Sequence, residues 1–547
     1  MRRQWALRMT STVSEVTARW AIHAQHAGST VARRTGMTDG PGRLLEPQPD
    51  HDWIHSVIKR TSSPAAMPAT LPAQPRPAGE ILHEVTRSIC PVCRVVIDAQ
   101  ILLRDDQVFI RKRCDEHGWF EGLIYADARA YVEQARFNKP GQAPARISTE
   151  VSRGCPLDCG LCPEHRQHTC LALIEVNTAC NLDCPVCFAN AGAGFNLTVP
   201  EAEAMLDRFV ELEGHPEVVQ FSGGEPTIHP HLLEMIDAAQ RRDIKYVMVN
   251  TNGVRIAGDP AWFERFAALR PLIYLQFDGL KDETYRVIRG EPLLETKLRA
   301  LDRLAEADLH VVLVAAIERD VNEHEAGAII EFGLKHPAVR GVMFQPVTHS
   351  GRHPDHDPMR RMTIPDVLRS IDAHSGGTFR ASDFVPIPCC SPTCSSVTYA
   401  YLGDDGDVVP LTRLIEVDQY LDYISNRATP GIDRDILHAL EGLWSAGSVP
   451  GGAQAENFVC AACDLDLPAL TDVARRVFMV QLRDFMDPWT FDVKKAMKCC
   501  IGILQDDGRM IPFCTYNTVG YREETRARLA ARHRGARSVP VLEGTPS

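Results

Sequence analysis

The sequence predicts an α/β protein built on a partial, open (β/α)6 barrel, with an N-terminal metal-binding module and a C-terminal extension that carries cysteines. Three observations support this fold class. Apolar segments alternate with amphipathic stretches between residues 171 and 350. The 18 cysteines are grouped, with none before Cys90 and none between Cys187 and Cys389. Beyond about residue 365 the alternation loosens, and helical stretches are separated by cysteine-bearing loops.

Six apolar segments are expected to form the barrel strands: LALIEV, EVVQFS, YVMVN, LIYLQF, VVLVAAI and GVMFQPV. Helix-like stretches such as EAEAMLDRFVELE, HLLEMIDAAQRR and AWFERFAAL separate them, so the strands should run parallel. Six units are fewer than the eight of a closed barrel, and active-site groups are expected at the carboxyl ends of the strands. Further helices are expected at IPDVLRSIDAH, DILHALEGLW and LTDVARRVFMVQLRDFM.

Composition and charge restrict the class of protein. The formal net charge of −12 argues against nucleic-acid binding, which usually needs a basic face. No apolar run is long enough to span a membrane, and charged residues interrupt any signal-peptide core. Grouped cysteines in such a chain indicate metal sites in a reducing compartment, so we expect a cytoplasmic protein, with peripheral membrane contact left open.

The first cysteine group predicts a mononuclear metal site. Cys90-Pro-Val-Cys93 and Cys114-x-x-His117 flank two apolar segments, VVIDAQILL and QVFIRKR, which should form a hairpin around an Asp-Asp turn. Two ligand pairs across a hairpin are typical of a rubredoxin-like or zinc-ribbon knuckle that binds one iron or zinc ion.

The spacing Cys180-x3-Cys184-x2-Cys187 directly follows the first barrel strand. Three thiolates on one loop can hold three irons of a 4Fe–4S cluster and leave the fourth iron open. The open iron can chelate the amino and carboxylate groups of S-adenosylmethionine (SAM), whose reductive cleavage yields a 5′-deoxyadenosyl radical. The competing interpretation is a structural zinc or ordinary ferredoxin site.

Polar motifs end the next three strands, where SAM would lie. The glycines of SGGEP let the backbone approach a ligand closely, and the Glu225 carboxylate could accept from the SAM ammonium. For the motifs that end the third and fourth strands, a plain turn or cap is the alternative. The candidate SAM-binding residues are Gly223, Gly224, Glu225, Pro226, Asn250, Asn252, Gln276 and Asp278.

Two further cysteine sets predict auxiliary clusters. Cys155, Cys159, Cys162 and Cys170 can complete a 4Fe–4S cluster with no open iron. The rival interpretation makes this set the SAM cluster, but no apolar strand precedes Cys155. The C-terminal set offers more thiols than one cluster needs, and Cys390, Cys460 and Cys463 are left over. The ligands chosen there are Cys389, Cys394, one of Cys499 and Cys500, and Cys514.

The motifs CNLDCPVC, SGGEP and NTNG resemble those of the radical SAM superfamily over about residues 171–350. One departure is that Val186, rather than an aromatic residue, precedes the third cysteine, while Phe188 follows it. The resemblance implies a radical SAM barrel, with flavodoxin or ferredoxin as the type of reductant.

The layout from about residue 85 to 517 resembles one subgroup, tetraether lipid synthase and its bacterial relatives. The matching segments are CPVC…CDEHG, GCPLDCGLCPEHRQHTC, IPCCSPTC, FMDPWTFD and DDGRMIPFC. This resemblance implies a rubredoxin-like metal, the SAM cluster and two auxiliary 4Fe–4S clusters. It also implies carbon–carbon coupling of lipid chains, or alternatively methylation of a pterin-like small molecule.

We therefore expect an enzyme that functionalises an unactivated C–H bond of a small-molecule or lipid substrate. A radical SAM peptide maturase and a non-catalytic iron–sulfur electron carrier are the alternatives. For a lipid, the expected features are an apolar channel and a basic head-group patch at Arg352, Arg360 and Arg361.

The expected domain organisation follows the cysteine groups. The predicted segments are a disordered tail and linker at 1–78, a rubredoxin/zinc-ribbon-like module at 79–140, an auxiliary cluster segment at 141–170, the core barrel at 171–350, a C-terminal iron–sulfur region at 351–520 and a tail at 521–547.

Overall fold

The computed structural model describes residues 79–141, 143–192, 194–353, 356–387, 390–403, 406–413 and 476–537. All of them belong to one compact unit. The predictions for residues 1–78, for Cys389 and for the helix at 435–444 lie outside the described residues. None of the described helices combines the length and the apolar character that a bilayer crossing requires.

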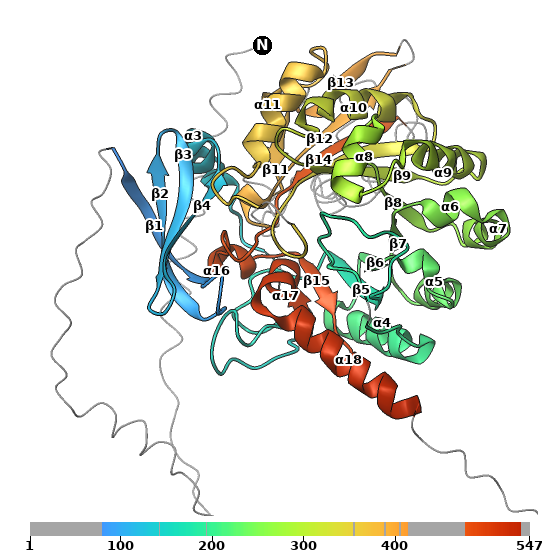
Figure 1. The fold of residues 1–547 in the computed structure, drawn as a ribbon, viewed down its shortest axis with the longest axis horizontal. Coiled ribbons are helices and arrows are strands. Elements are labelled where there is room, and N and C mark those ends of the chain that lie inside the picture. Colours follow the sequence, from blue (N-terminus) through green and yellow to red (C-terminus); the bar gives the residue numbers. More distant parts are fainter. Residues whose placement is uncertain are drawn as a thin grey trace, which may run out of the picture. The chain divides into compact units, whose positions relative to one another are not determined.

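The N-terminal module is a four-stranded antiparallel sheet in the order β1 (Ile81–Ile89), β2 (Val96–Arg104), β3 (Gln107–Cys114) and β4 (Gly118–Tyr125) (Figure 1). The predicted hairpin is β2–β3. Its turn residues, Asp105 and Asp106, have φ values of 52° and 58°. Two left-handed residues give the turn the twist of the flanking strands, and Asp tolerates that conformation.

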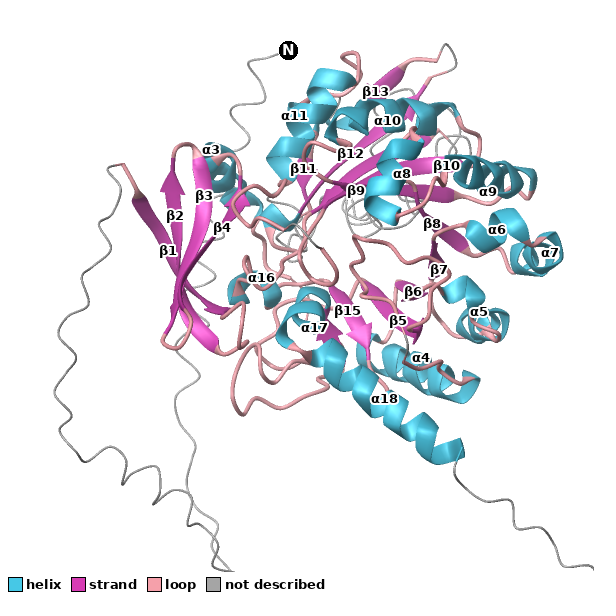
Figure 2. Ribbon diagram, in the orientation of Figure 1, coloured by secondary structure: helices cyan, strands magenta, loops and turns pink. Residues whose placement is uncertain are grey.

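The six predicted barrel strands are confirmed. They are β5 (Leu171–Asn177), β6 (Val218–Gly223), β7 (Tyr246–Thr251), β8 (Leu272–Gln276), β9 (Val311–Ile317) and β10 (Val339–Pro346). Each pairs in parallel with the next, and the intervening helices lie on the outside of the curved sheet (Figure 2). The core of the unit is formed where these helices pack on the outward faces of the strands.

The C-terminal part of the chain extends this sheet at both ends. β14 (Val477–Arg483) pairs in parallel with β10, and β15 (Ile501–Leu504) pairs in parallel with β5. The predicted helix over residues 470–486 is therefore wrong for Val477–Arg483. All seven residues of β14 are buried, so their apolar run lacks the alternation by which a half-exposed strand is distinguished from a helix.

The predicted tail at 521–547 is also wrong in its first part, because Tyr521–Arg537 forms helix α18. The remaining strands are β11 (Val385–Pro386), β12 (Ser395–Leu402), β13 (Val408–Pro410) and β16 (Met510–Pro512). The other α-helices are α3 (Ala128–Glu133), α4 (Val199–Glu213), α5 (Leu232–Gln240), α6 (Val254–Gly258), α7 (Pro260–Ala268), α8 (Asp282–Arg289), α9 (Leu294–Glu306), α10 (Ala326–Lys335), α11 (Ile364–His374), α16 (Val493–Ala496) and α17 (Phe513–Val519).

Hydrogen bonds join the N-terminal sheet to the C-terminal segment. The Thr86 hydroxyl donates to the Asp492 carboxylate over 2.6 Å, and the buried Lys112 ammonium donates to the Pro488 carbonyl over 2.6 Å. Because both ends of these bonds are buried, the module is fixed to the barrel by contacts that water does not weaken.

The pairing of β14 with β10 depends on a missing side chain. A Cβ atom added at Gly341 would lie 2.7 Å from the Met479 carbonyl oxygen and 3.0 Å from the Met479 Cβ. We predict that Gly341→Ala lowers the free energy of unfolding by about 1–3 kcal/mol, measured by chemical denaturation. Gly258→Ala is the matched control, because a Cβ there meets open space. Equal stabilities of the two variants would contradict the strand pairing.

Candidate active site

The period of two in the barrel strands directs one set of side chains into an interior cavity of about 1540 Å³, a volume that includes its open mouth. These residues share the inward-facing register of their strands. They are Leu171, Leu173 and Glu175 on β5, Gln220 and Ser222 on β6, Asn250 on β7, Tyr274 and Gln276 on β8, Val314 and Ala316 on β9, Met343 and Gln345 on β10, and Arg483 on β14.

The loop after β5 brings the three predicted cysteines to this cavity. Cys180, Cys184 and Cys187 all line it and pack around Leu182 and Tyr285. Burial raises the pKa of the Cys180 thiol to about 11 and also raises that of Cys184. A thiol with a raised pKa becomes a thiolate only next to positive charge, and the iron of a cluster would supply that charge. Three thiols on one loop therefore fit a 4Fe–4S cluster with one open iron.

Hydrogen bonds fix the conformation of the cysteine loop. The Asn252 amide group donates to the Asn181 side-chain oxygen over 2.7 Å and lies 3.9 Å from the Cys180 sulfur. At the other end of the loop, Cys187 and Arg352 exchange two backbone hydrogen bonds of 3.0 and 2.9 Å. The loop is therefore held from β7 on one side and from the segment after β10 on the other.

Glu225 has a different role from the one predicted. Its side chain is fully buried and does not line the cavity. The carboxylate accepts from the Thr227 amide (3.0 Å) and hydroxyl (2.6 Å), the Thr251 hydroxyl (2.7 Å) and the Asn252 amide (2.7 Å). With four donors already bound, it is a link between the ends of β6 and β7 rather than an acceptor for a ligand. Pro226 also lies outside the lining.

The two glycines of the same motif allow the end of β6 to lie against the start of the cysteine loop. Gly223 and Gly224 line the cavity. A Cβ atom at Gly223 would lie 2.2 Å from the Asn177 carbonyl oxygen, and one at Gly224 would lie 2.2 Å from the Ala179 carbonyl oxygen. These backbone atoms lead directly into Cys180, so only glycine lets the end of β6 lie against the start of the loop.

Asp278 also lies behind the cavity instead of lining it. Its buried carboxylate accepts two hydrogen bonds from Arg289, of 2.6 and 2.7 Å, and the Arg289 guanidinium lines the cavity next to Cys184. This bidentate pair raises the pKa of Arg289, which stays charged beside the cysteine loop. Asp278 therefore positions Arg289, a cation that was not among the predicted site residues.

Several other lining residues were missed. Side chains two residues apart on a strand share a face, so Glu175, Tyr274 and Gln345 could have been predicted to point into the cavity from their places on β5, β8 and β10. Arg483 and Arg522 could not be found in this way, since β14 and α18 were not predicted. The Phe188 ring stacks on the Phe513 ring with centroids 5.2 Å apart, and both rings line the cavity.

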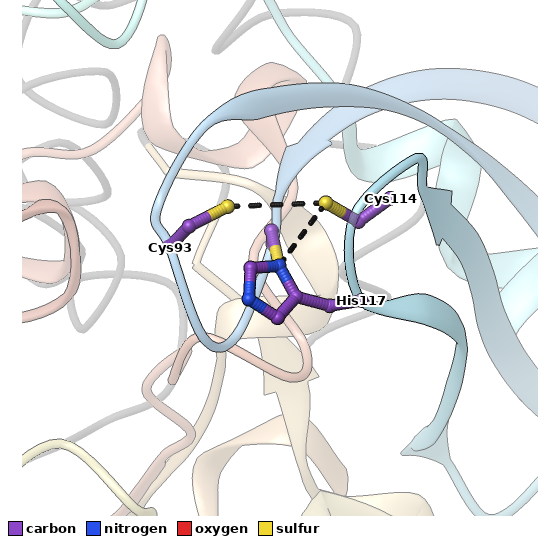
Figure 3. A group of neighbouring side chains, drawn as sticks. Cys93, Cys114 and His117 are labelled. Carbon is purple, nitrogen blue, oxygen red and sulfur yellow. Dashed lines mark hydrogen bonds between the residues drawn. The ribbon is translucent and has the colours of Figure 1, made fainter.

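In the N-terminal module the four predicted ligands converge. The donor atoms of Cys90, Cys93, Cys114 and His117 all lie within 4.8 Å of one another. The Cys93 and Cys114 sulfurs are 3.8 Å apart, and the Cys114 sulfur is 3.5 Å from His117 Nδ1 (Figure 3). A tetrahedral zinc ion with Zn–S bonds of 2.3 Å needs sulfurs about 3.8 Å apart, so the set fits a zinc ion.

The first auxiliary set lies between β5 and the C-terminal segment. Cys155, Cys159 and Cys170 are buried in one apolar cluster, and Cys162 is half-buried. The Cys159 amide donates to the Tyr521 hydroxyl over 3.2 Å, so helix α18 also supports this set.

In the C-terminal set, the thiols of Cys394 and Cys499 lie near enough to Cys514 to raise its pKa by repulsion. Cys389 lies outside the described residues. Burial raises the pKa of Cys394 to about 11 and that of Cys499 to about 12. Burial, followed by repulsion from Cys499, raises the pKa of Cys514. Repulsion from Cys394 also raises the pKa of both Cys499 and Cys514, which favours Cys499 over Cys500 for this set.

Comparisons with known proteins agree with this geometry. The family model "Radical SAM superfamily" matches residues 174–333. The 7,8-dihydro-6-hydroxymethylpterin dimethyltransferase of Methanocaldococcus jannaschii is 32% identical over 488 residues, which cover 82% of this chain and 96% of that protein. The chain belongs to the radical SAM superfamily. It is thus a radical SAM enzyme, and enzymes of this superfamily use SAM, a 4Fe–4S cluster and a reductant.

Other matches cover less of this radical SAM enzyme. Residues 82–126 match the family model "HMPTM N-terminal zinc ribbon domain", which agrees with the predicted module. The mycofactocin maturase of Mycobacterium ulcerans is 31% identical over 21% of this chain and 30% of that protein. The structure of Streptococcus suis SuiB bound to its precursor peptide covers 35% of this chain and 44% of its own, with 14% identity and a TM-score of 0.30.

The two C-x3-C-x2-C loops should respond differently to substitution. We predict that Cys184→Ala abolishes the release of 5′-deoxyadenosine from SAM, because it removes a ligand of the cluster with the open iron. Cys162→Ala is the matched variant and should retain SAM cleavage. If Cys162→Ala were inactive while Cys184→Ala still cleaved SAM, the two loops would have been assigned the wrong way round.

Proposed function

We propose that this radical SAM enzyme methylates a C–H position of a pterin-like heterocycle. The observation that carries the proposal is the similarity to the M. jannaschii pterin dimethyltransferase, which extends over 96% of that protein. It includes the N-terminal ribbon as well as the barrel. A relationship that extends through every module supports a shared substrate class better than a match to the barrel alone.

The chemistry of the cavity supports a polar, planar substrate. A pterin offers ring nitrogens, a carbonyl and an amino group along its edges. Side-chain amides can donate to and accept from such edges, and Gln220 and Gln345 line the cavity. The Gln345 amide already donates to the Tyr274 hydroxyl over 3.1 Å, so this pair is oriented before a ligand binds.

The SAM site in this proposal lies at the carboxyl ends of β5 to β8. Cys180, Cys184 and Cys187 would hold the cluster, and Gly223, Gly224, Asn250, Asn252 and Gln276 would surround SAM. The reduced cluster and one SAM would supply a 5′-deoxyadenosyl radical that removes hydrogen from carbon, leaving methionine and 5′-deoxyadenosine. A second SAM would supply the methyl group and leave as S-adenosylhomocysteine, with the electrons coming from the reductant. Arg289 and Asp278 keep a fixed charge beside the cysteine loop, and Phe188 and Phe513 exclude water from that side of the cavity.

The auxiliary sets would serve electron transfer in this scheme. Cys155, Cys159, Cys162 and Cys170 would hold one 4Fe–4S cluster. Cys394, Cys499 and Cys514 would hold three corners of another, with Cys389 as the fourth ligand. Phe513 lines the cavity and precedes Cys514 directly, so the second cluster would lie next to the substrate cavity.

A lipid chain is the second candidate substrate. One observation favours it: the deeper wall of the cavity is apolar and includes Leu171, Leu173, Val314, Met343, Ile501 and Ile503. The expected head-group patch, however, is already paired. Arg352 pairs with Asp183, Arg360 with Asp320, and the buried Arg361 with Asp484.

The reconstituted enzyme should convert 7,8-dihydro-6-hydroxymethylpterin, in the presence of SAM and a reductant, to a product in which one or two hydrogens are replaced by methyl groups, detected by mass spectrometry. Gln345→Leu should lower this rate about tenfold or more, because it leaves polar substrate atoms unpaired in the cavity. Gln240→Leu, at an exposed position on α5, is the control. Release of 5′-deoxyadenosine with a lipid but with no pterin product would overturn the proposal.

A further inference from the structure

Three histidines gather beside the barrel, next to the loop that carries Cys187. His349, His353 and His356 follow β10 within one loop. Their ring centroids are 4.9 Å apart for His349 and His356, 5.4 Å for His353 and His356, and 6.3 Å for His349 and His353. We refer to these three residues as the histidine cluster.

Each ring in the histidine cluster has a buried nitrogen without a hydrogen-bond partner. These atoms are Nδ1 of His349, Nδ1 of His353 and Nε2 of His356. The side chains of His353 and His356 are only 9% and 6% exposed. A buried polar atom left unpaired costs about 1–3 kcal/mol, so three of them together indicate a ligand that supplies what the protein does not.

Two carboxylates accompany the rings. A Glu318 oxygen lies 3.2 Å from His353 Nε2, and a fully buried Asp487 oxygen lies 3.5 Å from His356 Nε2. Asp487 also accepts from the His349 backbone amide over 3.2 Å. At His353 the carboxylate faces one ring nitrogen and the other nitrogen is free, which is the arrangement that orients a histidine toward a metal ion. At His356 the carboxylate faces the same nitrogen that has no hydrogen-bond partner.

The neighbouring cations do not neutralise these carboxylates by direct pairing. Arg361 pairs with Asp484, and Arg360 pairs with Asp320. The Lys112 ammonium donates to Ser88 and to the Pro488 carbonyl. Among the described residues Glu318 and Asp487 form no salt bridge with a lysine or arginine, although the charges of Arg94, Lys112 and Arg361 act on Asp487.

The ring separations agree with a shared ion. A zinc–nitrogen bond of about 2.1 Å places an imidazole centroid about 3.2 Å from the ion, and tetrahedral ligands then have centroids about 5.3 Å apart. The observed 4.9–6.3 Å bracket this value. Among the described residues, only the ribbon ligands already bring their donor atoms within 4.8 Å of one another. Rotation of the rings would therefore accompany binding.

We propose that His349, His353 and His356 bind a divalent transition-metal ion of the zinc type, with Glu318 orienting His353 and Asp487 contributing negative charge beside His356. The ion would lie beside a cavity of about 970 Å³ that His353 and His356 line together with Val186 of the cysteine loop. Nitrogen ligands with carboxylate support are the donors that zinc accepts in such sites.

Zinc content tests this proposal without reference to methylation. The full-length protein, with its clusters reconstituted so that iron occupies the cluster cysteines, is exposed to zinc and desalted. Elemental analysis should give two zinc ions per chain for the wild type, one of them in the ribbon. The triple variant His349→Ala, His353→Ala, His356→Ala should hold one, and a control triple variant at the exposed His215, His231 and His324 should hold two.

X-ray absorption at the zinc edge provides the second measurement. Loss of a nitrogen-ligated zinc should raise the average sulfur coordination from about one and a half to about three per zinc, which the ribbon alone supplies. His353→Gln keeps the size of the side chain and should also lose the second zinc if the triple variant folds poorly. One zinc in the wild type, or two in the cluster variant, would overturn the proposal.

Discussion

The buried Glu225 carboxylate is the constraint on which the active site depends. It joins the ends of β6 and β7 through four hydrogen bonds. Burial raises its pKa, and the hydrogen bonds from Asn252, Thr227 and Thr251 oppose that shift. The backbone amide of Asn252 donates to Glu225, and the side-chain amide of Asn252 donates to Asn181 of the cysteine loop. Lys297 adds a 2.5 Å hydrogen bond to the Asn252 carbonyl from α9.

The C-terminal part of the chain adds a strand at each open edge of the sheet that the six βα units form. β14 and β15 cover the two edges of the barrel sheet, whose unpaired backbone groups would otherwise remain exposed. The C-terminal part of the chain also brings positive charge into the cavity, through Arg483 of β14 and Arg522 of α18. Arg522 of α18 is buried, donates to the Phe188 carbonyl over 2.9 Å, and lies near Glu175 of β5. The C-terminal region is therefore part of the site and not an appendage to it.

Local patterns in the sequence allowed much of this to be predicted. The six strands, the Asp105–Asp106 turn and the metal ligands of the ribbon depend on short-range spacing. The failures have a different cause. Val477–Arg483 is buried on both faces, so its apolar run does not distinguish a strand from a helix. The roles of Glu225 and Asp278 depend on partners from other segments, namely Thr251 and Arg289. The function of α18 depends on contacts with residues more than 300 positions away.

We infer that the loop of Cys180, Cys184 and Cys187 holds a cluster whose open iron binds SAM. Electron–nuclear double resonance of the reduced enzyme, with SAM labelled at its amino nitrogen, tests it most directly. The account predicts a hyperfine coupling between that nitrogen and the cluster, unchanged in Cys162→Ala, where the auxiliary set is incomplete. A wild-type enzyme whose clusters are all reduced but show no coupling to the labelled nitrogen would contradict it.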